Sequence, residues 1–349
     1  MQHKYCVEAV NHMLNDICQQ DEHTFFGNIP IIFGGDFAQI LPVIRRGNQA
    51  AIVNASLQRS VLWPRLRQLR LTQNMRVQQG IANIEFAQFL GQMSYTPELQ
   101  VQISLPAGVK CFHNIQVFCN SIFPTTCLQN TYNNLSIFRD RTILAFRNDT
   151  VTMFNDLLIQ QLPGELHIFN SVNTADINDS AAQTEELPAE YLQSIQHAAL
   201  PPSRLCLKLG APVILIRNLN PKDGLCNGTR MVVTRLGRSC IEVRILGGDF
   251  DGQCKLLPRI TLSTTEDDLP FILSRKQFPI RLCFAMTVNK SQGQSFRIMG
   301  IDLRTPAFCH GQLYVALSRI TNIDGLSALL PANGPPTTEN IVYSEALLQ

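Results

Sequence analysis

The sequence is poor in the features that mark membrane, secreted and disordered proteins. No apolar run approaches the ~18 residues that a membrane-spanning helix needs, and residues 1–4 lack the apolar core of a secretory signal. Charged residues make up only 16% of the 349 residues, whereas apolar residues make up 45%, a balance typical of globular proteins. The composition predicts a folded protein of two or three domains in a reducing intracellular compartment.

Metal-binding signatures are also missing. The chain has 11 cysteines, scattered from Cys6 to Cys309, but no Cys-x-x-Cys pair. Structural zinc sites usually contain such close pairs. The seven histidines lack ligand spacing as well. The sequence therefore predicts free thiols that pack like small apolar side chains, and no metal site built by the protein.

Positive charge is absent from one long segment. Residues 149–200 contain no Lys or Arg and eight acidic residues, for a charge of −8. Residues 1–148 carry 12 basic and 8 acidic residues (+4), and residues 201–349 carry 17 and 11 (+6). A basic carboxyl-terminal part suits a groove for a polyanion, although ordinary surface variation explains the same numbers equally well.

Hydrophobic periodicity predicts an α/β domain at both ends of the chain. Helical spacing predicts helices over 3–19, 81–93 and 148–161, the first burying Cys6, Val10, Leu14 and Ile17. Short apolar runs predict buried strands over 29–33, 68–72, 142–146, 281–286 and 298–303, and a short helix over 310–320. Alternating strands and helices of this kind are typical of a doubly wound α/β domain.

The middle of the chain has a different texture. After Pro201-Pro202, short strand-like runs alternate with turns such as Asn227-Gly228 and Gly247-Gly248. The runs cover residues 212–216, 230–234, 241–245 and 254–257. They predict a small barrel-like β module inserted into the α/β domain.

Four polar clusters follow or flank the predicted strands. They are Gly34-Gly35-Asp36-Phe37-Ala38-Gln39, Leu71-Thr72-Gln73-Asn74-Met75-Arg76, the run from Thr287 to Ser295, and Leu313-Tyr314-Val315-Ala316-Leu317-Ser318-Arg319. Ligands bind at the carboxyl edge of open α/β sheets, where Asp36 could hold a metal-bound water and Gln39 could contact a phosphate. The arginines could neutralise a transferring phosphoryl group. The alternatives are an Asp-capped glycine turn, a solvated loop at 287–295 and two surface arginines.

Together the clusters resemble, in order and spacing, the later motifs of superfamily 1 DNA helicases of the PIF type (petite integration frequency), which include the helicase part of Helitron transposons. The first cluster, continued by Ile40-Leu41-Pro42-Val43, is similar to motif III, and the second to motif IV. Lys290-Ser291-Gln292-Gly293-Gln294 resembles motif V, and Tyr314 to Arg319 resembles motif VI. The segments 207–213, 217–219 and 224–230 resemble the SH3-like insert of that family.

The resemblance implies a RecA-like P-loop NTPase helicase fold, an α/β class, with an inserted SH3-like β-barrel. Residues 1–75 would be a partial first RecA-like domain. Residues 76–204 and 279–335 would form the second, with the β insert over 205–278 and a tail over 336–349. ATP and Mg²⁺ would bind at the domain interface, and single-stranded DNA would cross the domain tops.

Site residues follow from the matched positions. Gln39 would sense the γ-phosphate, and Arg76 and Arg319 would act as arginine fingers, so these three are the predicted catalytic residues. Asp36, Gln292 and Gly293 join them around the nucleotide. Thr287, Asn289 and Lys290 would lie near the DNA backbone. Two departures are Ala38, where a larger or basic residue is common, and Asn289, where His is frequent.

The sequence lacks the two motifs that hold nucleotide phosphates in this family. It contains no Gly-x-x-x-x-Gly-Lys-Ser/Thr, and Asp21-Glu22 follows a predicted helix and not a buried strand. The main ligands of ATP and Mg²⁺ are therefore expected upstream, as in a helicase severed after motif II. The family-level expectation is an ATP-dependent DNA helicase, with little activity from this chain alone. The alternative is a single-stranded DNA-binding remnant, and a hydrolase using Asp36 lacks a recognisable nucleophile–base pair.

The resemblance also implies a cellular setting. Partners would be single-stranded DNA and duplex junctions, with no membrane and no obligate protein partner. The processes would be DNA repair, recombination, telomere maintenance or transposition. We expect the protein in the nucleus, with the mitochondrion as the alternative.

Overall fold

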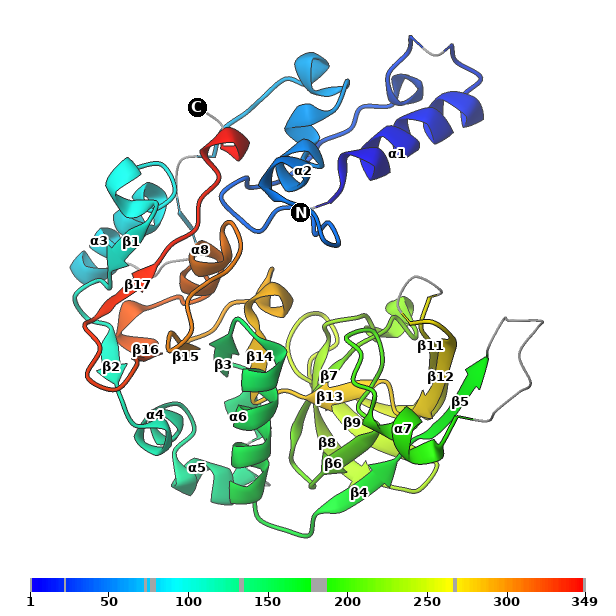
Figure 1. Ribbon diagram of the computed structural model, residues 1–349, viewed down its shortest axis with the longest axis vertical. Coiled ribbons are helices and arrows are strands. Elements are labelled where there is room, and N and C mark those ends of the chain that lie inside the picture. The colour runs from blue at the N-terminus through cyan, green and yellow to red at the C-terminus, as the bar shows by residue number, and fades with distance from the viewer. Residues whose placement is uncertain are drawn as a thin grey trace. The chain divides into compact units, whose positions relative to one another are not determined.

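The computed structural model describes residues 2–21, 23–71, 74–75, 80–131, 135–176, 187–265 and 269–347 (Figure 1). The chain divides into two compact units. The first comprises residues 1–114, 291–297 and 301–349, and the second comprises residues 115–290 and 298–300. No helix within the described residues is long and apolar enough to cross a membrane.

The first unit combines helices with short strands. Its helices are α1 (Lys4–Ile17), α2 (Gln49–Asn54), α3 (Ile81–Gln92) and α8 (Gln312–Leu317), with short 3-10 turns η1 (Phe26–Asn28), η2 (Leu57–Arg59), η3 (Trp63–Arg65), η4 (Pro97–Leu99), η9 (Ile323–Gly325) and η10 (Ser344–Ala346). Its strands are β1 (Gln102–Ser104), β2 (Lys110–Phe112), β16 (Leu326–Leu329) and β17 (Thr337–Glu339). Strand β16 runs parallel to β2, and β1 pairs antiparallel with β17.

Helix α1 confirms the predicted helix but buries a different face. Val10 and Ile17 are exposed, whereas Asn11 and Asn15 are buried. Asn11 Oδ1 accepts the Phe26 N–H at 2.8 Å, and Asn15 Oδ1 accepts the Gly27 N–H at 2.7 Å. Hydrogen bonds to a buried turn thus decide the orientation of the helix, because a buried N–H without an acceptor costs more than an exposed apolar side chain.

Two predicted strands are wrong. Residues 29–33 and 68–71 form no strand, and Ile32 and Leu71 are almost fully exposed, at 98% and 101%. A buried parallel strand exists only where neighbouring strands pair with its backbone on both sides. The described residues supply no such neighbours to these two runs, so their apolar composition alone does not produce a strand.

The second unit carries most of the β structure. Its helices are α4 (Ile115–Ile122), α5 (Thr125–Gln129), α6 (Asn148–Gln161) and α7 (Ala189–Ser194), with 3-10 turns η6 (Leu135–Phe138) and η7 (Pro221–Asp223). Its strands are β3 (Arg141–Ala145), β4 (His167–Asn170), β5 (Val172–Asp176), β6 (Arg204–Leu207), β7 (Pro212–Leu215), β8 (Arg230–Leu236), β9 (Cys240–Ile245), β10 (Cys254–Pro258), β11 (Ile260–Ser263), β12 (Ile272–Gln277), β13 (Ile280–Leu282) and β14 (Ala285–Thr287). The turn η8 (Val288–Ser291) and the strand β15 (Ile298–Asp302) continue from the second unit into the first.

The predicted β module is present as an antiparallel sheet. Five strands lie in the order β10-β9-β8-β7-β13, and their inward side chains form one apolar core. Beside it, β11-β12-β5 form a three-stranded sheet and β4 pairs with β6. The four strands predicted between residues 212 and 257 are therefore confirmed as β7 to β10. Short antiparallel strands joined by tight turns need only local pairing, which the sequence pattern records well.

Strand β14 positions the run that begins at Thr287. It pairs in parallel with β3, which is buried along most of its length, and α6 packs on both strands. Asn155 of α6 bonds both backbone groups of Ala285, donating to its C=O at 3.1 Å and accepting its N–H at 2.9 Å. The predicted strand 142–146 and the helix 148–161 are thus confirmed, whereas the predicted strand 281–286 is divided between β13 and β14.

Candidate functional site

Asp36 and Gln39 form a polar turn in the first unit. The Asp36 Oδ1 atom accepts the Ala38 N–H at 3.0 Å, which closes an Asx-type turn. Gln39 Nε2 donates to Asp36 Oδ2 at 3.3 Å. Both side chains are half-buried, and their neighbours in the chain, Phe37, Ala38 and Ile40, are buried. The carboxylate of Asp36 is therefore engaged in holding the turn and its glutamine.

Tyr314 on α8 joins this turn to the motif that carries Arg319. Its hydroxyl donates to Asp36 Oδ2 at 2.9 Å, although the two residues are 278 positions apart. Burial, followed by the negative charge of Asp36, raises the pKa of Tyr314. A phenol that stays protonated is a constant hydrogen-bond donor, so this bond joins α8 to the Asp36 turn.

Gly311 permits this close approach. It has φ +72° and caps the amino-terminal end of α8, and its N–H donates to the Ile341 C=O at 3.1 Å. A Cβ atom at this position would lie 2.4 Å from the Ala38 carbonyl oxygen. Only glycine accepts both the left-handed backbone and the contact.

His310 fixes the same junction from inside. It is 1% exposed, and its Nε2 lies 2.8 Å from the Phe37 C=O, while its Nδ1 accepts the Tyr343 N–H at 2.8 Å. One nitrogen faces an acceptor and the other a donor, so the imidazole is the neutral Nε2–H tautomer. Burial lowers the pKa of His310, against smaller opposite effects of the Phe37 carbonyl and the Asp36 charge.

We expect acid to weaken the first unit through His310. Its folded-state pKa lies below its unfolded value of ~6.5, so the stabilisation is complete above that pH and is lost as the pH falls below it. Urea unfolding followed by the fluorescence of Trp63, the one tryptophan in the chain, should show a loss of about 1 kcal/mol between pH 7.5 and 5.5. His310→Gln should reduce this pH dependence. An equally steep profile in that variant would contradict the assignment.

Arg319 is buried and already bonded. It is 1% exposed, with Nε donating to the Val315 C=O at 2.9 Å, Nη1 to the Gln294 C=O at 3.3 Å and Nη2 to Ser318 Oγ at 2.7 Å. These contacts tie α8 to the segment after Lys290. To touch a phosphate, the guanidinium would have to exchange some of these partners.

Of the other residues predicted to bind nucleotide, two have a described position and one does not. Gln292 is half-buried, and Gly293 is exposed at φ +81° in the turn where the Gln294 N–H donates to the Ser291 C=O at 3.0 Å. Arg76 lies outside the described residues. The first unit therefore brings together Asp36 and Gln39, and Arg319 with the 291–297 segment, while Arg76 has no described position.

The predicted DNA residues lie at the end of β14 in the second unit. Thr287 is the last residue of the strand, and Asn289 and Lys290 are exposed in the turn that follows. Lys290 Nζ donates to Asn227 Oδ1 of the β module at 3.3 Å. Partial burial, followed by the charges of Arg281 and Arg217, lowers the pKa of Lys290.

Tyr314 and His310 are the functional candidates that the predicted site residues omit. Tyr314 begins the predicted motif VI and His310 lies just before it, but their partners Asp36 and Phe37 are more than 270 residues away along the chain. No periodicity or spacing in the sequence reveals such a pair. The only available signal is the presence of hydrogen-bonding side chains beside an otherwise apolar helix.

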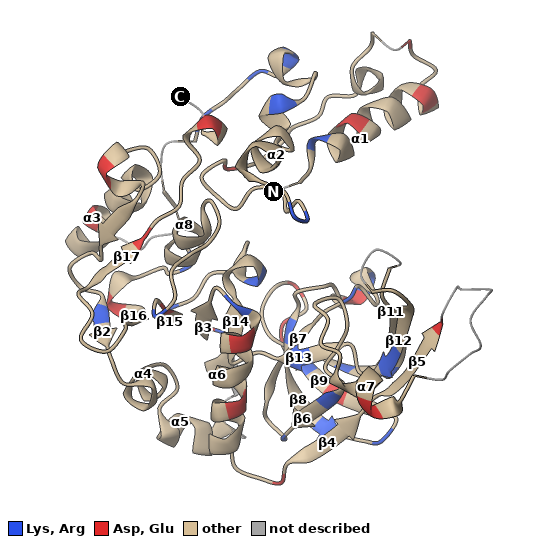
Figure 2. Cartoon of the chain, in the orientation of Figure 1, with Lys and Arg blue, Asp and Glu red and all other residues tan. Residues whose placement is uncertain are grey.

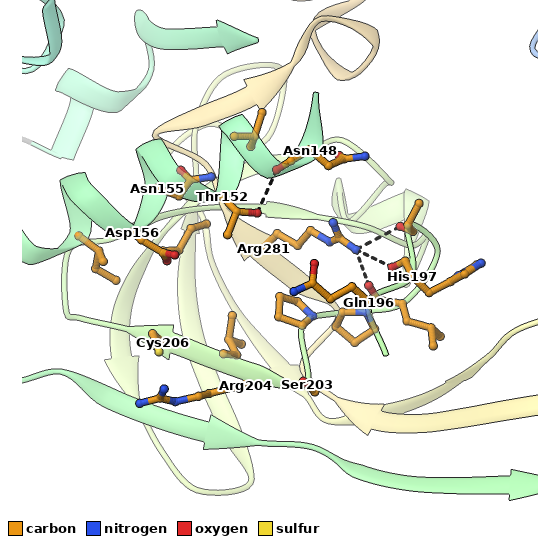
Figure 3. A pocket seen from close by; sticks show the side chains of 18 of the residues that line it. Asn148, Thr152, Asn155, Asp156, Gln196, His197, Ser203, Arg204, Cys206 and Arg281 are labelled. Atoms are coloured by element: carbon orange, nitrogen blue, oxygen red, sulfur yellow. Dashed lines mark hydrogen bonds between the residues drawn. The ribbon is translucent and has the colours of Figure 1, made fainter. Parts of the chain in front are cut away.

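The second unit also contains a cavity of 680 Å³ (Figure 3). Its walls come from α6, from the segment 196–206 and from Arg275, Arg281 and Leu282. Burial raises the pKa values of Asp156 and Cys206, which line it. None of the residues predicted for nucleotide or DNA binding lines this cavity.

Comparisons with known proteins show which helicases the chain is similar to. Residues 1–93 match the model of the PIF1-like helicase, and residues 190–236 match the model of the DNA helicase Pif1 2B domain. The human ATP-dependent DNA helicase PIF1 is 36% identical over 191 residues, which cover 54% of this chain and 27% of the human protein. Over these residues the chain is similar to PIF1-like helicases. It spans about a quarter of the length of that relative.

Solved Pif1 helicases have the same fold. The Candida albicans Pif1 helicase has a TM-score of 0.62 at 21% identity, with 96% of this chain and 70% of that chain covered. The Bacteroides Pif1 helicase in complex with ADP-AlF3 and single-stranded DNA has a TM-score of 0.61 at 23% identity, covering 94% and 68%. The predicted RecA-like α/β helicase fold is therefore confirmed, and the predicted domain boundaries stay a prediction.

Proposed function

We propose that this chain supplies the strand-binding and coupling motifs of an ATP-dependent DNA helicase. The observation that carries the proposal is the end of β14, where a buried parallel strand delivers Thr287, Asn289 and Lys290 to an exposed turn. A hydroxyl, an amide and an ammonium group can all donate to phosphate oxygens, and such contacts provide sequence-independent affinity. The similarity to PIF1-like helicases supports single-stranded DNA as the polyanion.

The nucleotide roles rest on the first unit. Gln39 senses the γ-phosphate of ATP, and Arg319, with Arg76, stabilises the charge that develops on the phosphoryl group. Asp36, Gln292 and Gly293 line the same site. The bond from Tyr314 to Asp36 supports this arrangement, because it links the turn of Gln39 to the helix preceding Arg319.

The described residues do not by themselves fit a complete ATP and Mg²⁺ site. They contain no group of three or more His, Cys, Asp or Glu side chains able to hold a metal ion. The 349 residues also contain no phosphate-binding glycine loop with its lysine. Without these ligands the β- and γ-phosphates are not held in line for attack, so the chain alone hydrolyses ATP poorly.

The wider role is unwinding of DNA at duplex junctions during repair, recombination, telomere maintenance or transposition, as in a Helitron. The nucleus is the proposed location, with the mitochondrion as the alternative. Residues 205–278 form the SH3-like insert of the second RecA-like domain. The second candidate function is single-stranded DNA binding without catalysis, which the missing phosphate loop favours.

One pair of assays tests the proposal. Fluorescence anisotropy with a labelled oligo-dT should show binding that weakens steeply between 50 and 200 mM salt, about as the counterion-release relation predicts. Lys290→Gln should lower the affinity. ATP turnover should stay at background with or without the oligonucleotide. Strand-stimulated turnover would contradict the incompleteness of the ATP site, and salt-independent or absent binding would contradict the DNA-binding role.

A further inference from the structure

Two arginines in the second unit are held by neutral groups. Arg275 on β12 is 1% exposed, and its donors reach Asn173 Oδ1 and the backbone carbonyls of Pro201, Leu192 and Ile195, at 2.7 to 3.1 Å. Arg281 on β13 donates from Nη2 to three carbonyls of residues 197–200, at 2.6 to 3.2 Å (Figure 3). Carbonyl dipoles stabilise these cations without cancelling their charge.

The charge of this pair extends towards the proposed DNA surface. Burial lowers the pKa values of Arg275 and Lys290, and the positive charge of Arg281 adds to both effects. Arg217 lowers the pKa of Lys290 as well. Arg281 is therefore near enough to affect both the buried Arg275 and the exposed Lys290, and Arg217 is near enough to affect Lys290. Figure 2 shows blue Lys and Arg positions among the strands of the β module. Like charges this close together create a positive potential that a bound anion would reduce.

Hydrogen bonds fix the loop 216–229 between β7 and β8, which carries the exposed Arg217. The Asn227 N–H donates to Asn218 Oδ1 at 2.7 Å, and the Gly228 N–H donates to the Leu215 C=O at 2.8 Å. Asn227 in turn accepts the bond from Lys290. Within the described part of the chain, no hydrogen bond or ion pair involves the Arg217 side chain, so its donors remain available.

We infer that Arg217 and Asn227 of the β module extend the Lys290 surface and bind the phosphate backbone of single-stranded DNA. The inference rests on the proposed function and names two further contact residues for it. Arg217 offers a planar fork suited to a phosphate group, and Asn227 orients the Lys290 ammonium. The buried Arg275 and Arg281 add to the positive potential at this surface without contacting the DNA.

The charge-neutralising variant Arg217→Gln tests the inference in the full chain. Its affinity for labelled oligo-dT should fall about five-fold at 100 mM salt, and the slope of log K against log[salt] should decrease by about 0.7, which corresponds to one phosphate contact on a single strand. Asn227→Ala should weaken binding less. Arg238→Gln is the matched control, because Arg238 is exposed in the turn between β8 and β9, at the other end of β8 from the Arg217 loop. Its affinity and slope should equal those of the unchanged chain.

The outcomes separate the inference from the proposed function. If the unchanged chain binds and Lys290→Gln weakens binding, but Arg217→Gln matches Arg238→Gln in affinity and slope, the inference is wrong and the proposed function stands. If the unchanged chain does not bind oligo-dT, both are wrong. Circular dichroism and thermal unfolding of each variant confirm that an affinity loss does not come from misfolding.

Discussion

Replacing Gly311 with alanine should destabilise the first unit by about 3 kcal/mol, from a left-handed backbone cost of 1–2 kcal/mol and a steric cost of similar size. The new Cβ would lie 2.4 Å from the Ala38 carbonyl oxygen, which belongs to backbone and cannot rotate away. Helix α8 must then withdraw from the Phe37–Gln39 turn. The bonds from Tyr314 to Asp36 and from His310 to Phe37 should be lost with it.

Trp63 provides a direct reading of this displacement. Its ring packs edge-on against Phe37, with ring centroids 5.5 Å apart. We expect the emission of Gly311→Ala to shift to the red already without urea, and its urea midpoint to fall.

Gly91→Ala is the control for this substitution. Gly91 lies inside α3, and nothing lies within 4 Å of a Cβ added there. That variant should gain about 0.5–1 kcal/mol, because alanine is the better helix former. Equal behaviour of the two variants would contradict the account of Gly311.

Replacing Arg275 with methionine should loosen the segment 189–203 by about 3 kcal/mol. Methionine keeps the apolar stem but leaves the carbonyls of Leu192, Ile195 and Pro201 without their donor. Each buried acceptor left unsatisfied costs about 1–3 kcal/mol, partly offset because a desolvated charge is also removed. Burial lowers the pKa of Arg275, in agreement with that offset.

Amide hydrogen exchange is the appropriate measurement, because the chain has two units and a single unfolding midpoint would mix them. Exchange across 189–203 should accelerate by about two orders of magnitude, the equivalent of 3 kcal/mol in local opening. Lys276→Met, at the exposed neighbouring position on β12, should leave the exchange unchanged. An unchanged exchange rate in Arg275→Met would show that the carbonyls find other donors.

Local patterns predicted most elements of the second unit. The strands β7 to β10 lie where apolar periodicity and turn residues place them, because each pairs with a neighbour close in the sequence. The strand β3 and the helix α6 also lie where the pattern places them, although β3 pairs in parallel with the distant β14. The runs 29–33 and 68–72 have equally strong apolar patterns, yet 29–33 and 68–71 form no strand. Strand formation in a parallel sheet depends on partners distant in sequence, which the pattern does not encode.

The candidate site, too, was only partly predictable from the sequence. Motif order in the sequence singled out Asp36, Gln39, Lys290 and Arg319 as candidate site residues and indicated a similarity to PIF-type helicases. It did not reveal that Asp36 is bonded by Tyr314, that Arg319 is buried among its own neighbours, or that Lys290 donates to Asn227 of the β module.

The amino-acid sequence alone thus determined the fold class, the similarity to PIF-type helicases and the polar residues available for chemistry, because these depend on residue types and their order. The tertiary structure decided which face of α1 is buried, how His310 and Gly311 hold the Asp36 turn against α8, and which charges surround Lys290. These features depend on hydrogen bonds, steric contacts and electrostatic fields between segments far apart in the chain, and only the folded chain brings those segments within reach of one another.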